Sequence, residues 1–371
     1  MAEPVALPSF PFQQRIGASD AVTLVEESCF AISSSVGDME PGRPQGLFFS
    51  DTRILSRLRV TLDGKELEPL AASTPNPFSA LFVSRIPSRP GADDSTILVL
   101  RSRYVGRGMR EDIVVRNYGL EPSYRRLAVR AEADLASLFD VKEGLALGEQ
   151  PARPADFDTG SIYFEHAEAG IQRGVRIRFS QVPNLIDGTA YFELVIAPED
   201  SWSVCLEVTP VVQGSEVEPL YRCGDPVERA APVQRLARWR RDTPVLSCSH
   251  EGLASVVRAA SQDLAALRMP DPERPDRMIV AAGAPWFMAL FGRDSLITSW
   301  MALLFDLDLA MGTLQTLARF QGKDVDPRTD EQPGRILHEL RMEEAASLSI
   351  DAGTANYGSV DATPLFVMLL G

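Results

Sequence analysis

The chain has 371 residues, which is enough for two or three domains with sizeable cores. It holds 37 lysine and arginine residues against 51 aspartate and glutamate residues, so its formal net charge is −14. Nucleic acid and anionic membrane surfaces would be repelled by this charge, so neither is an expected partner, and a neutral ligand is favoured.

The N-terminal residues lack a basic start followed by an apolar run, and no apolar stretch approaches the ~20 residues that span a bilayer. We therefore expect a soluble, cytoplasmic protein. The cysteines are far apart and form no Cys-X-X-Cys pair, so Cys29, Cys205, Cys223 and Cys248 are expected to be reduced thiols. With three histidines, a histidine-built metal centre is not expected, and no cofactor is predicted.

Residues 22–210 alternate between apolar and polar side chains, as half-buried strands do. Leu58, Val60 and Leu62 take one face of a predicted strand, and Asp63-Gly64 follows as a tight hairpin turn. The same alternation recurs in segments 96–105, 111–116, 126–132, 175–179 and 202–208. Short strands in series, with turn residues between them, predict an antiparallel β-sandwich.

Charged residues lie along these predicted strands. The arginines alternate with apolar residues and are balanced by acids, so we interpret them as a solvated sheet face and not as a basic patch. Asp51 and Arg53 can share one strand face, and we interpret them as a structural ion pair at a strand end. Segment 116–122, with Asn117 and Gly119, has the turn chemistry of a connection between paired strands.

The pattern becomes helical near Gly224. Residues 225–241 are charged, with apolar residues at helical spacing, and predict a linker helix. Further helices are predicted over 253–267, 295–305 and 309–320, and long loops over 270–292 and 321–362. Successive helices joined by brief turns predict an array of helical hairpins, in which the long loops gather at one end and carry the site.

The chain ends in an apolar run, residues 363–371, that should open a buried helix, with nothing after it to cover that surface. We therefore expect a truncated chain whose helical domain is incomplete. The expected domains are a β-sandwich over 1–222, a linker helix over 223–243 and an all-α domain over 244–371. The oligomeric state is not predicted.

The first candidate site lies in segment 283–300, where Arg293 and Asp294 start an apolar helix after a loop that carries Trp286. Asp294 can be the N-cap of this helix, or it can be the proton donor of a sugar site. A donor that works near neutral pH needs a raised pKa, whereas a helix N-terminus and Arg293 both lower the pKa of a carboxyl group. Trp286 can fill a core or stack on a sugar face. Spacing alone leaves these alternatives open.

The loop over 324–361 is rich in side chains that bind hydroxyl groups. Asn, Gln, Arg, Asp and Glu give paired hydrogen bonds to vicinal diols, which suits a polyol ligand. Each such residue alone can also be a solvated loop residue, so the hypothesis depends on their concentration in one loop. The candidates for substrate binding are Gln332, Arg335, His338, Glu339, Tyr357 and Asp361.

Three motifs, in this order, resemble those of the bacterial glycogen-debranching, amylo-α-1,6-glucosidase-like family. They are Phe-Gly-Arg-Asp-Ser-Leu-Ile at 291–297, Gln-Pro-Gly-Arg-Ile-Leu-His-Glu at 332–339, and Tyr-Gly-Ser-Val-Asp-Ala-Thr-Pro-Leu-Phe at 357–366. Segments 46–56 and 116–122 are similar to the N-terminal β-domain of that family. The resemblance implies a β-sandwich followed by an (α/α) toroid of six helical hairpins, which acts on α-glucan branch stubs with inversion.

The same resemblance implies that Asp294 is the general acid and that Trp286, Arg293, Glu339 and Asp361 line the pocket. It places the general base in a later part of the toroid, beyond Gly371. Inverting hydrolysis needs two carboxyl groups roughly 6.5 to 9.5 Å apart with water between them. The chain as given is therefore expected to be inactive or impaired, and Glu339 and Asp361 are not favoured as substitutes for the base.

Two alternatives remain for the function. One is an α-glucan-binding module without turnover, which the missing base suggests. The other is a different toroid glycosidase, such as a trehalase-like or glycosylglycerate hydrolase-like enzyme, because pocket shape and not the motif selects the aglycone. The expected partner is an α-glucan or oligosaccharide substrate.

Overall fold

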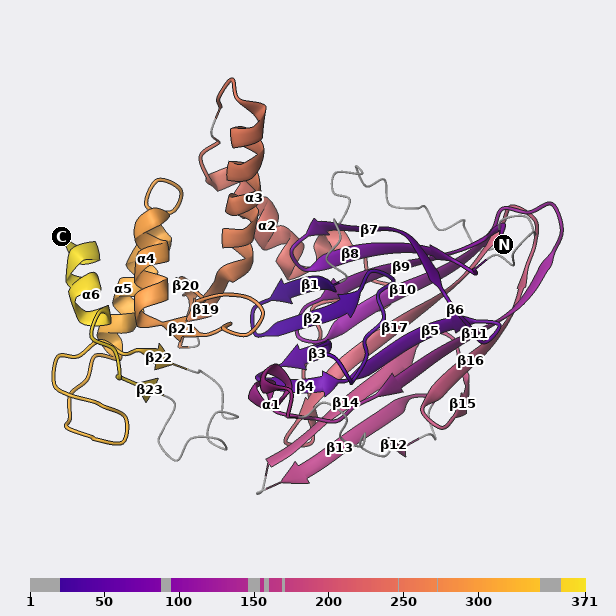
Figure 1. The fold of residues 1–371 in the computed structure, drawn as a ribbon, viewed down its shortest axis with the longest axis horizontal. Coiled ribbons are helices and arrows are strands. Elements are labelled where there is room, and N and C mark those ends of the chain that lie inside the picture. The colour runs from indigo at the N-terminus through magenta and orange to yellow at the C-terminus, as the bar shows by residue number, and fades with distance from the viewer. Residues whose placement is uncertain are drawn as a thin grey trace.

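The computed structural model describes residues 21–87, 95–145, 154–156, 160–168, 171–245, 247–271, 273–340 and 355–371. A sheet-rich N-terminal domain fills one side of the molecule, and the helices that follow it gather at the other side (Figure 1). This arrangement agrees with the predicted order of a β-sandwich followed by a helical part.

The largest sheet of the described residues has nine strands, and all its pairs are antiparallel. Its order is β12 (Pro154–Asp156), β13 (Ile162–Glu168), β14 (Ile171–Phe179), β17 (Ser201–Val212), β10 (Met109–Asn117), β9 (Ile97–Val105), β8 (Ser79–Arg85) and β7 (Glu68–Asn76), and β18 (Ser215–Glu216) pairs with β17. The predicted segments 111–116, 175–179 and 202–208 lie within strands of this sheet, and segment 96–105 begins one residue before β9.

Two smaller antiparallel sheets complete the sheet-rich domain. One has the order β15 (Asn184–Ile186), β16 (Thr189–Ile196), β11 (Ser123–Glu132), β5 (Arg57–Leu62) and β6 (Lys65–Glu66), and the other has β1 (Ala21–Glu26), β2 (Cys29–Ser34), β3 (Gly46–Phe49) and β4 (Thr52–Leu55). The three sheets share one buried apolar cluster, to which Leu24, Val60 and Ile113 belong. Burial of this cluster on folding is the main force that holds the sheets together. The short helix α1 (Leu138–Glu143) packs beside β4.

The predicted hairpin after β5 is confirmed. Leu58, Val60 and Leu62 are fully buried while the residues between them are half-buried, and Thr61 pairs with Glu66 across the turn. Asp63 and Gly64 adopt φ angles of 55° and 72°. A two-residue turn with both φ angles positive suits Asp-Gly, because glycine takes this conformation without a steric penalty.

The interpretation of the strand arginines as a solvated face is wrong for Arg101 and Arg103. Both are fully buried on the core side of β9, where Arg103 pairs with the buried carboxylate of Glu111 at 2.6 Å and Arg101 pairs with Glu111 and Asp38. Polar alternation could not reveal this, because the carboxylates that compensate these charges come from other segments. A buried charge is tolerated only when it is paired in this way.

The expected ion pair between Asp51 and Arg53 is also wrong in its partner. Arg53 is fully buried and forms its ion pair with Asp134, which follows β11. The Arg53 guanidinium also donates to the backbone oxygen of Gln45 at 3.2 Å. Arg53 therefore ties the start of β4 to the second sheet and to the loop before β3.

The expectation of four reduced cysteines is wrong as well. Cys205 on β17 and Cys223 form a disulfide, with their Cα atoms 5.8 Å apart. The chain reverses after β17, and the backbone N–H of Cys223 donates to Glu207 Oε2 at 3.1 Å, which brings the two thiols together. Cys29, which is buried, and Cys248, which is exposed, do not take part in this disulfide.

The linker region holds the 3₁₀ helix η1 (Val227–Arg229) and α2 (Ala231–Asp242), where the sequence predicts a helix. Leu236 and Trp239 of α2 are buried in a cluster with aromatic residues of the sheet-rich domain, including Phe78. Arg235 of α2 forms ion pairs with Glu26 and, at 3.0 Å, with Glu27. The helix is therefore packed along the sheets and does not project as a free connection.

The helical part contains α3 (Glu251–Leu267), α4 (Gly292–Met301), α5 (Leu307–Arg319) and α6 (Ala362–Leu370). The predicted helices are present at these places, with α4 starting three residues earlier than expected. The expected long loop at 270–292 instead holds a hairpin of β19 (Arg268–Asp271) and β20 (Arg274–Val280). Helices α4 and α5 pack on β20 and on α6, and the apolar stripe predicted for α3 is exposed at Leu253 and Val256.

Candidate functional site

A small antiparallel sheet joins the three predicted motifs. Strands β21 (Leu290–Phe291), β22 (Glu339–Leu340) and β23 (Ala355–Asn356) pair with Phe291 opposite Glu339 and Glu339 opposite Asn356. Each strand belongs to, or adjoins, one motif segment, and α4 and α6 begin shortly after β21 and β23 (Figure 1). Residues far apart in the sequence are thereby brought to one edge of the helical part.

Gly292 permits this close approach. A Cβ atom at this position would lie 2.1 Å from the backbone oxygen of Leu337 and 2.8 Å from the Cβ of Ala362. The Gly292 N–H donates to the backbone oxygen of His338 at 2.9 Å. The glycine of the Gly-Arg-Asp motif therefore allows its segment to pack closely against the segments that contain Leu337 and Ala362. Any side chain at this position would push these segments apart.

Asp294 is not the N-cap of α4. Phe291 occupies the cap position without a side-chain hydrogen bond, and Asp294 is the acidic residue of the first turn. Its side chain is 38% exposed, and its Oδ2 lies 3.8 Å from the Nε of Arg293. A carboxylate in the first turn is stabilised by the amide groups of the helix N-terminus. Of the two alternatives for this residue, the structure removes the capping one.

Arg293 lies between two carboxylates. One terminal nitrogen of its guanidinium donates to Asp361 Oδ2 at 3.3 Å, while its Nε faces Asp294. The Ser359 hydroxyl also bonds to Asp361, and together with Arg293 it lowers the pKa of the Asp361 carboxyl below its ordinary value. Asp361 is therefore ionised at neutral pH. Sequence reasoning missed Ser359, although its position two residues before Asp361 is typical of a local hydrogen bond.

His338 and Tyr357 flank two strands of the small sheet, His338 directly before β22 and Tyr357 directly after β23. The His338 ring meets the Phe291 ring edge to face, with centroids 5.7 Å apart. Tyr357 is buried, and its hydroxyl donates to the backbone oxygen of Phe320 at 2.8 Å. The position of Tyr357 is thus fixed by the end of α5, and Glu339 is half-buried on the neighbouring strand.

Gln332 and Arg335 lie in the turn that precedes β22. The Arg335 guanidinium donates to the backbone oxygen of Asp330 at 2.6 Å, and its backbone N–H donates to the oxygen of Gln332 at 3.0 Å. The Gln332 side chain is exposed. The contacts of Arg335 therefore stabilise the turn itself, whereas Arg293, Asp294 and Asp361 contact one another.

Trp286 contacts the sheet-rich domain. Its ring meets Phe30 and Phe48 edge to face, with centroid separations of 6.1 and 5.8 Å, and Phe30 and Phe48 stack on each other at 4.5 Å. The neighbouring Phe287 lies under the ammonium group of Lys142, 4.3 Å from its ring centroid. The loop before α4 is therefore anchored on the sheets and on α1. Sequence reasoning did not identify Phe30 or Phe48 as partners of Trp286.

Within the described residues, no group of three or more His, Cys, Asp or Glu side chains is placed to hold a metal ion. None of the helices in the described ranges is both long enough and apolar enough to cross a membrane. The chemical groups available at the candidate site are carboxylates, one guanidinium, an imidazole and aromatic rings.

Comparison with known proteins gives one family match and a related fold. Residues 24–207 match the family model described as the N-terminal domain of (some) glycogen debranching enzymes. A solved structure titled "Putative kojibiose phosphorylase from human microbiome" is similar with a TM-score of 0.55 and 10% sequence identity, over 82% of this chain. The chain spans 47% of the length of that structure. No curated protein matches the sequence.

Proposed function

Because residues 24–207 form a domain of the family found at the N-terminus of glycogen debranching enzymes, we propose that the chain belongs to a glycoside hydrolase of debranching type. Its reaction is hydrolysis of α-1,6-glucosidic bonds of an α-glucan with inversion. The observation that carries this proposal is the convergence of three motif segments on one small sheet, next to Asp294, Arg293 and Asp361. The helical part is proposed to belong to an (α/α) toroid.

In this proposal Asp294 is the general acid. It transfers its proton to the glycosidic oxygen as the bond from that oxygen to the anomeric carbon breaks, and water attacks the anomeric carbon from the opposite face. The carboxylate that activates the attacking water is not assigned to a residue of this chain.

The other candidate residues are proposed to bind the substrate. Asp361 holds the Arg293 guanidinium by a hydrogen bond, so this cation is shared and does not neutralise Asp294 alone. Glu339 and His338, on the strand next to Phe291, are proposed to bind sugar hydroxyls. Gln332 and Arg335 contribute from the adjoining turn, and Tyr357 and Trp286 support the aromatic side of the pocket.

The test is glucose release from a limit dextrin by the protein that the complete reading frame encodes. Asp294→Asn should lower the rate at least ~100-fold, which is the low end for loss of a general acid. The matched control is Asp308→Asn, because Asp308 is the acidic residue in the first turn of the neighbouring helix α5. Equal rates for wild type and Asp294→Asn would refute the assignment of the acid.

The alternatives are separated by a substrate panel. Binding of maltooligosaccharides without turnover would favour an α-glucan-binding module. Cleavage of trehalose or a glycosylglycerate in preference to dextrin would favour another toroid glycosidase. The similar structure is titled as a phosphorylase, so each substrate is also tested with added inorganic phosphate. Formation of a sugar phosphate would show that the reaction is phosphorolysis and not hydrolysis.

A further inference from the structure

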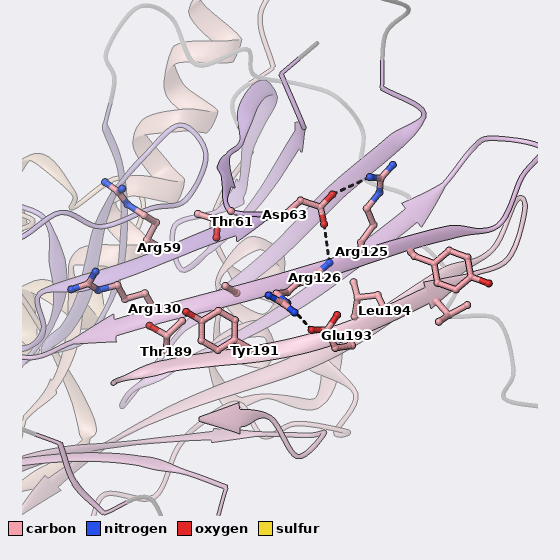
Figure 2. Close-up of a pocket in the computed structure, with 14 residues that line it drawn as sticks. Arg59, Thr61, Asp63, Arg125, Arg126, Arg130, Thr189, Tyr191, Glu193 and Leu194 are labelled. Carbon is pink, nitrogen blue, oxygen red and sulfur yellow. Dashed lines mark hydrogen bonds and ion pairs between the residues drawn. The ribbon is translucent and has the colours of Figure 1, made fainter. Parts of the chain in front are cut away.

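The outer face of the sheet that contains β11 carries an open hollow of about 730 Å³ (Figure 2). Its lining residues come from β5, β11 and β16 and from the turn after β5. None of them belongs to the cluster around Asp294. The function proposed above makes no use of this surface.

The strand register explains the shape of the hollow. Ala128 of β11 lies opposite Tyr191 of β16 on one side and opposite Thr61 of β5 on the other. Arg126 and Arg130 lie two residues away along β11 and share the outward face with Ala128. The small side chain of Ala128 lies among the longer side chains of Arg126, Arg130 and Tyr191, which leaves a depression with Ala128 as its floor.

The charges around the hollow are compensated. Arg126 pairs with Glu193 at 2.6 Å, and Arg125 pairs with Asp63 at 2.9 Å, as the dashed lines in Figure 2 show. The remaining lining arginines are paired in the same way, Arg59 with Glu40 at 2.6 Å and Arg130 with Glu132 through an Nε donor at 2.8 Å. An anion would meet a carboxylate beside each guanidinium. Neutral hydroxyl groups instead find N–H donors and carboxylate acceptors side by side.

Aromatic and hydroxyl side chains complete the surface. Tyr191 stands beside Thr189 in Figure 2, and Tyr124 lies opposite Val195 at the other end of the same strand pair. Tyr124 is 73% exposed and Val195 is 66% exposed. Tyr191 is half-buried. Tyrosine rings that reach the surface offer flat apolar faces with a polar edge, which suits the faces of pyranose rings.

We propose that this hollow is a non-catalytic binding site for a neutral oligosaccharide chain, with Tyr191 stacking on a sugar ring above Ala128 and the paired arginines binding its hydroxyl groups. The choice of an α-glucan as the oligosaccharide rests on the proposed function. Such a site would hold a polymeric substrate at the sheet-rich domain while the helical part acts on a chain end.

The test is retardation of the protein in native gels that contain glycogen, together with a titration with maltoheptaose. Tyr191→Ala removes the stacking ring, and Ala128→Met fills the floor without adding charge. Both should weaken binding at least ~10-fold, which corresponds to loss of one good contact of about 1.4 kcal/mol. The matched control is Tyr118→Ala, because Tyr118 is 49% exposed and lies in a turn outside the hollow.

Three outcomes would overturn the inference. The first is no retardation of the wild type. The second is unchanged affinity in both Tyr191→Ala and Ala128→Met. The third is a concentration-dependent dimer of the wild type that Ala128→Met abolishes, which would assign the hollow to a second copy of the chain. Asp294→Asn separates this inference from the proposed function, because it should abolish glucose release and leave the Tyr191-dependent retardation in place.

Discussion

Arg293, in the first turn of α4, donates a hydrogen bond at 3.3 Å to Asp361, which immediately precedes α6. Their helices pack against each other, so this contact fixes the two helix starts at the edge of the candidate site. Both side chains are partly exposed, at 49% and 38%, and the contact is therefore expected to matter more for position than for stability.

Asp361→Asn should lower the free energy of unfolding at neutral pH by at most about 1 kcal/mol, because exposed ion pairs are screened by water. The pKa of Asp361 is lowered in the native protein, first by the Ser359 hydroxyl and then by Arg293. The contribution of the ionised Asp361 carboxylate to stability is therefore present above the pKa that this group has in the unfolded chain. It is lost as the pH falls through the lower pKa that the group has in the native protein. NMR titration of the carboxyl group checks this, and Ser359→Ala should raise the pKa of Asp361. An unchanged pKa in Ser359→Ala would contradict the assignment.

Gly292→Ala should destabilise the helical part by about 1 to 3 kcal/mol, the usual cost of overpacking. The new Cβ would lie 2.1 Å from the backbone oxygen of Leu337, which cannot move without disturbing β22. Gly283→Ala is the control, because a Cβ at Gly283 meets no atom within 4 Å. Urea denaturation of the two variants measures the difference, and equal stabilities would show that the segments are not in contact as described.

Trp286→Ala should lower the free energy of unfolding by roughly 2 kcal/mol, less than for a fully buried tryptophan because the ring is half-buried. The loss comes from its edge-to-face contacts with Phe30 and Phe48. Trp300→Ala, at a position that is 53% exposed, should change stability by less than about 0.5 kcal/mol. If Trp286→Ala weakened maltooligosaccharide binding without changing the thermal transition, a direct role in sugar stacking would replace the packing role.

Glu26 makes the contact between β1 and α2 sensitive to pH. Burial raises the pKa of Glu26 to about 7 from its ordinary value of 4.5, and Arg235 offsets only part of this effect. Between pH 4.5 and about 7 the Glu26 carboxyl is more protonated in the native protein than in the unfolded chain. The contribution of the protonated carboxyl to the free energy of unfolding is therefore full below pH 4.5 and is lost as the pH rises through about 7.

Glu26→Gln removes this titration. The free energy of unfolding of the variant, taken relative to wild type, should therefore increase as the pH is raised from about 5 to about 9. Denaturant titrations across this range check the trend. Glu27→Gln is the control, because Glu27 pairs with the same arginine at 3.0 Å. A difference between Glu26→Gln and wild type that stays constant with pH would exclude Glu26 as the titrating group.

Cys223→Ser should lower the free energy of unfolding by about 3 kcal/mol, the value for a disulfide that closes a loop of this size. The two cysteines are 18 residues apart in the sequence. In the denatured, unreduced wild type, a thiol reagent should titrate Cys29 and Cys248 and leave Cys205 and Cys223 unreacted. Reaction of all four thiols would show that the bridge is not formed in solution.

The sequence was sufficient where structure depends on neighbouring residues. The alternation of Leu58, Val60 and Leu62 and the Asp63-Gly64 turn predicted β5 and its hairpin, because both depend on local backbone geometry. The helices were found for the same reason, since their apolar spacing is a local pattern.

The sequence was insufficient where structure depends on partners from distant segments. The pairing of Arg53 with Asp134 and of Arg101 with Asp38 is decided by which segments the fold brings side by side. At the candidate site, the motif residues could be named from their resemblance to a known family. The close approach of Gly292 to Leu337 and the packing of Trp286 on Phe48 could be seen only in the folded structure.

The anchoring of Trp286 on Phe30 and Phe48 restricts how the two parts of the molecule can be recombined. The loop that leads into α4 takes its position from residues of another domain. A chimaera that joins this helical part to a foreign sheet domain would therefore need residues equivalent to Phe30 and Phe48. Without them, the loop before α4 would lose the contacts that position it.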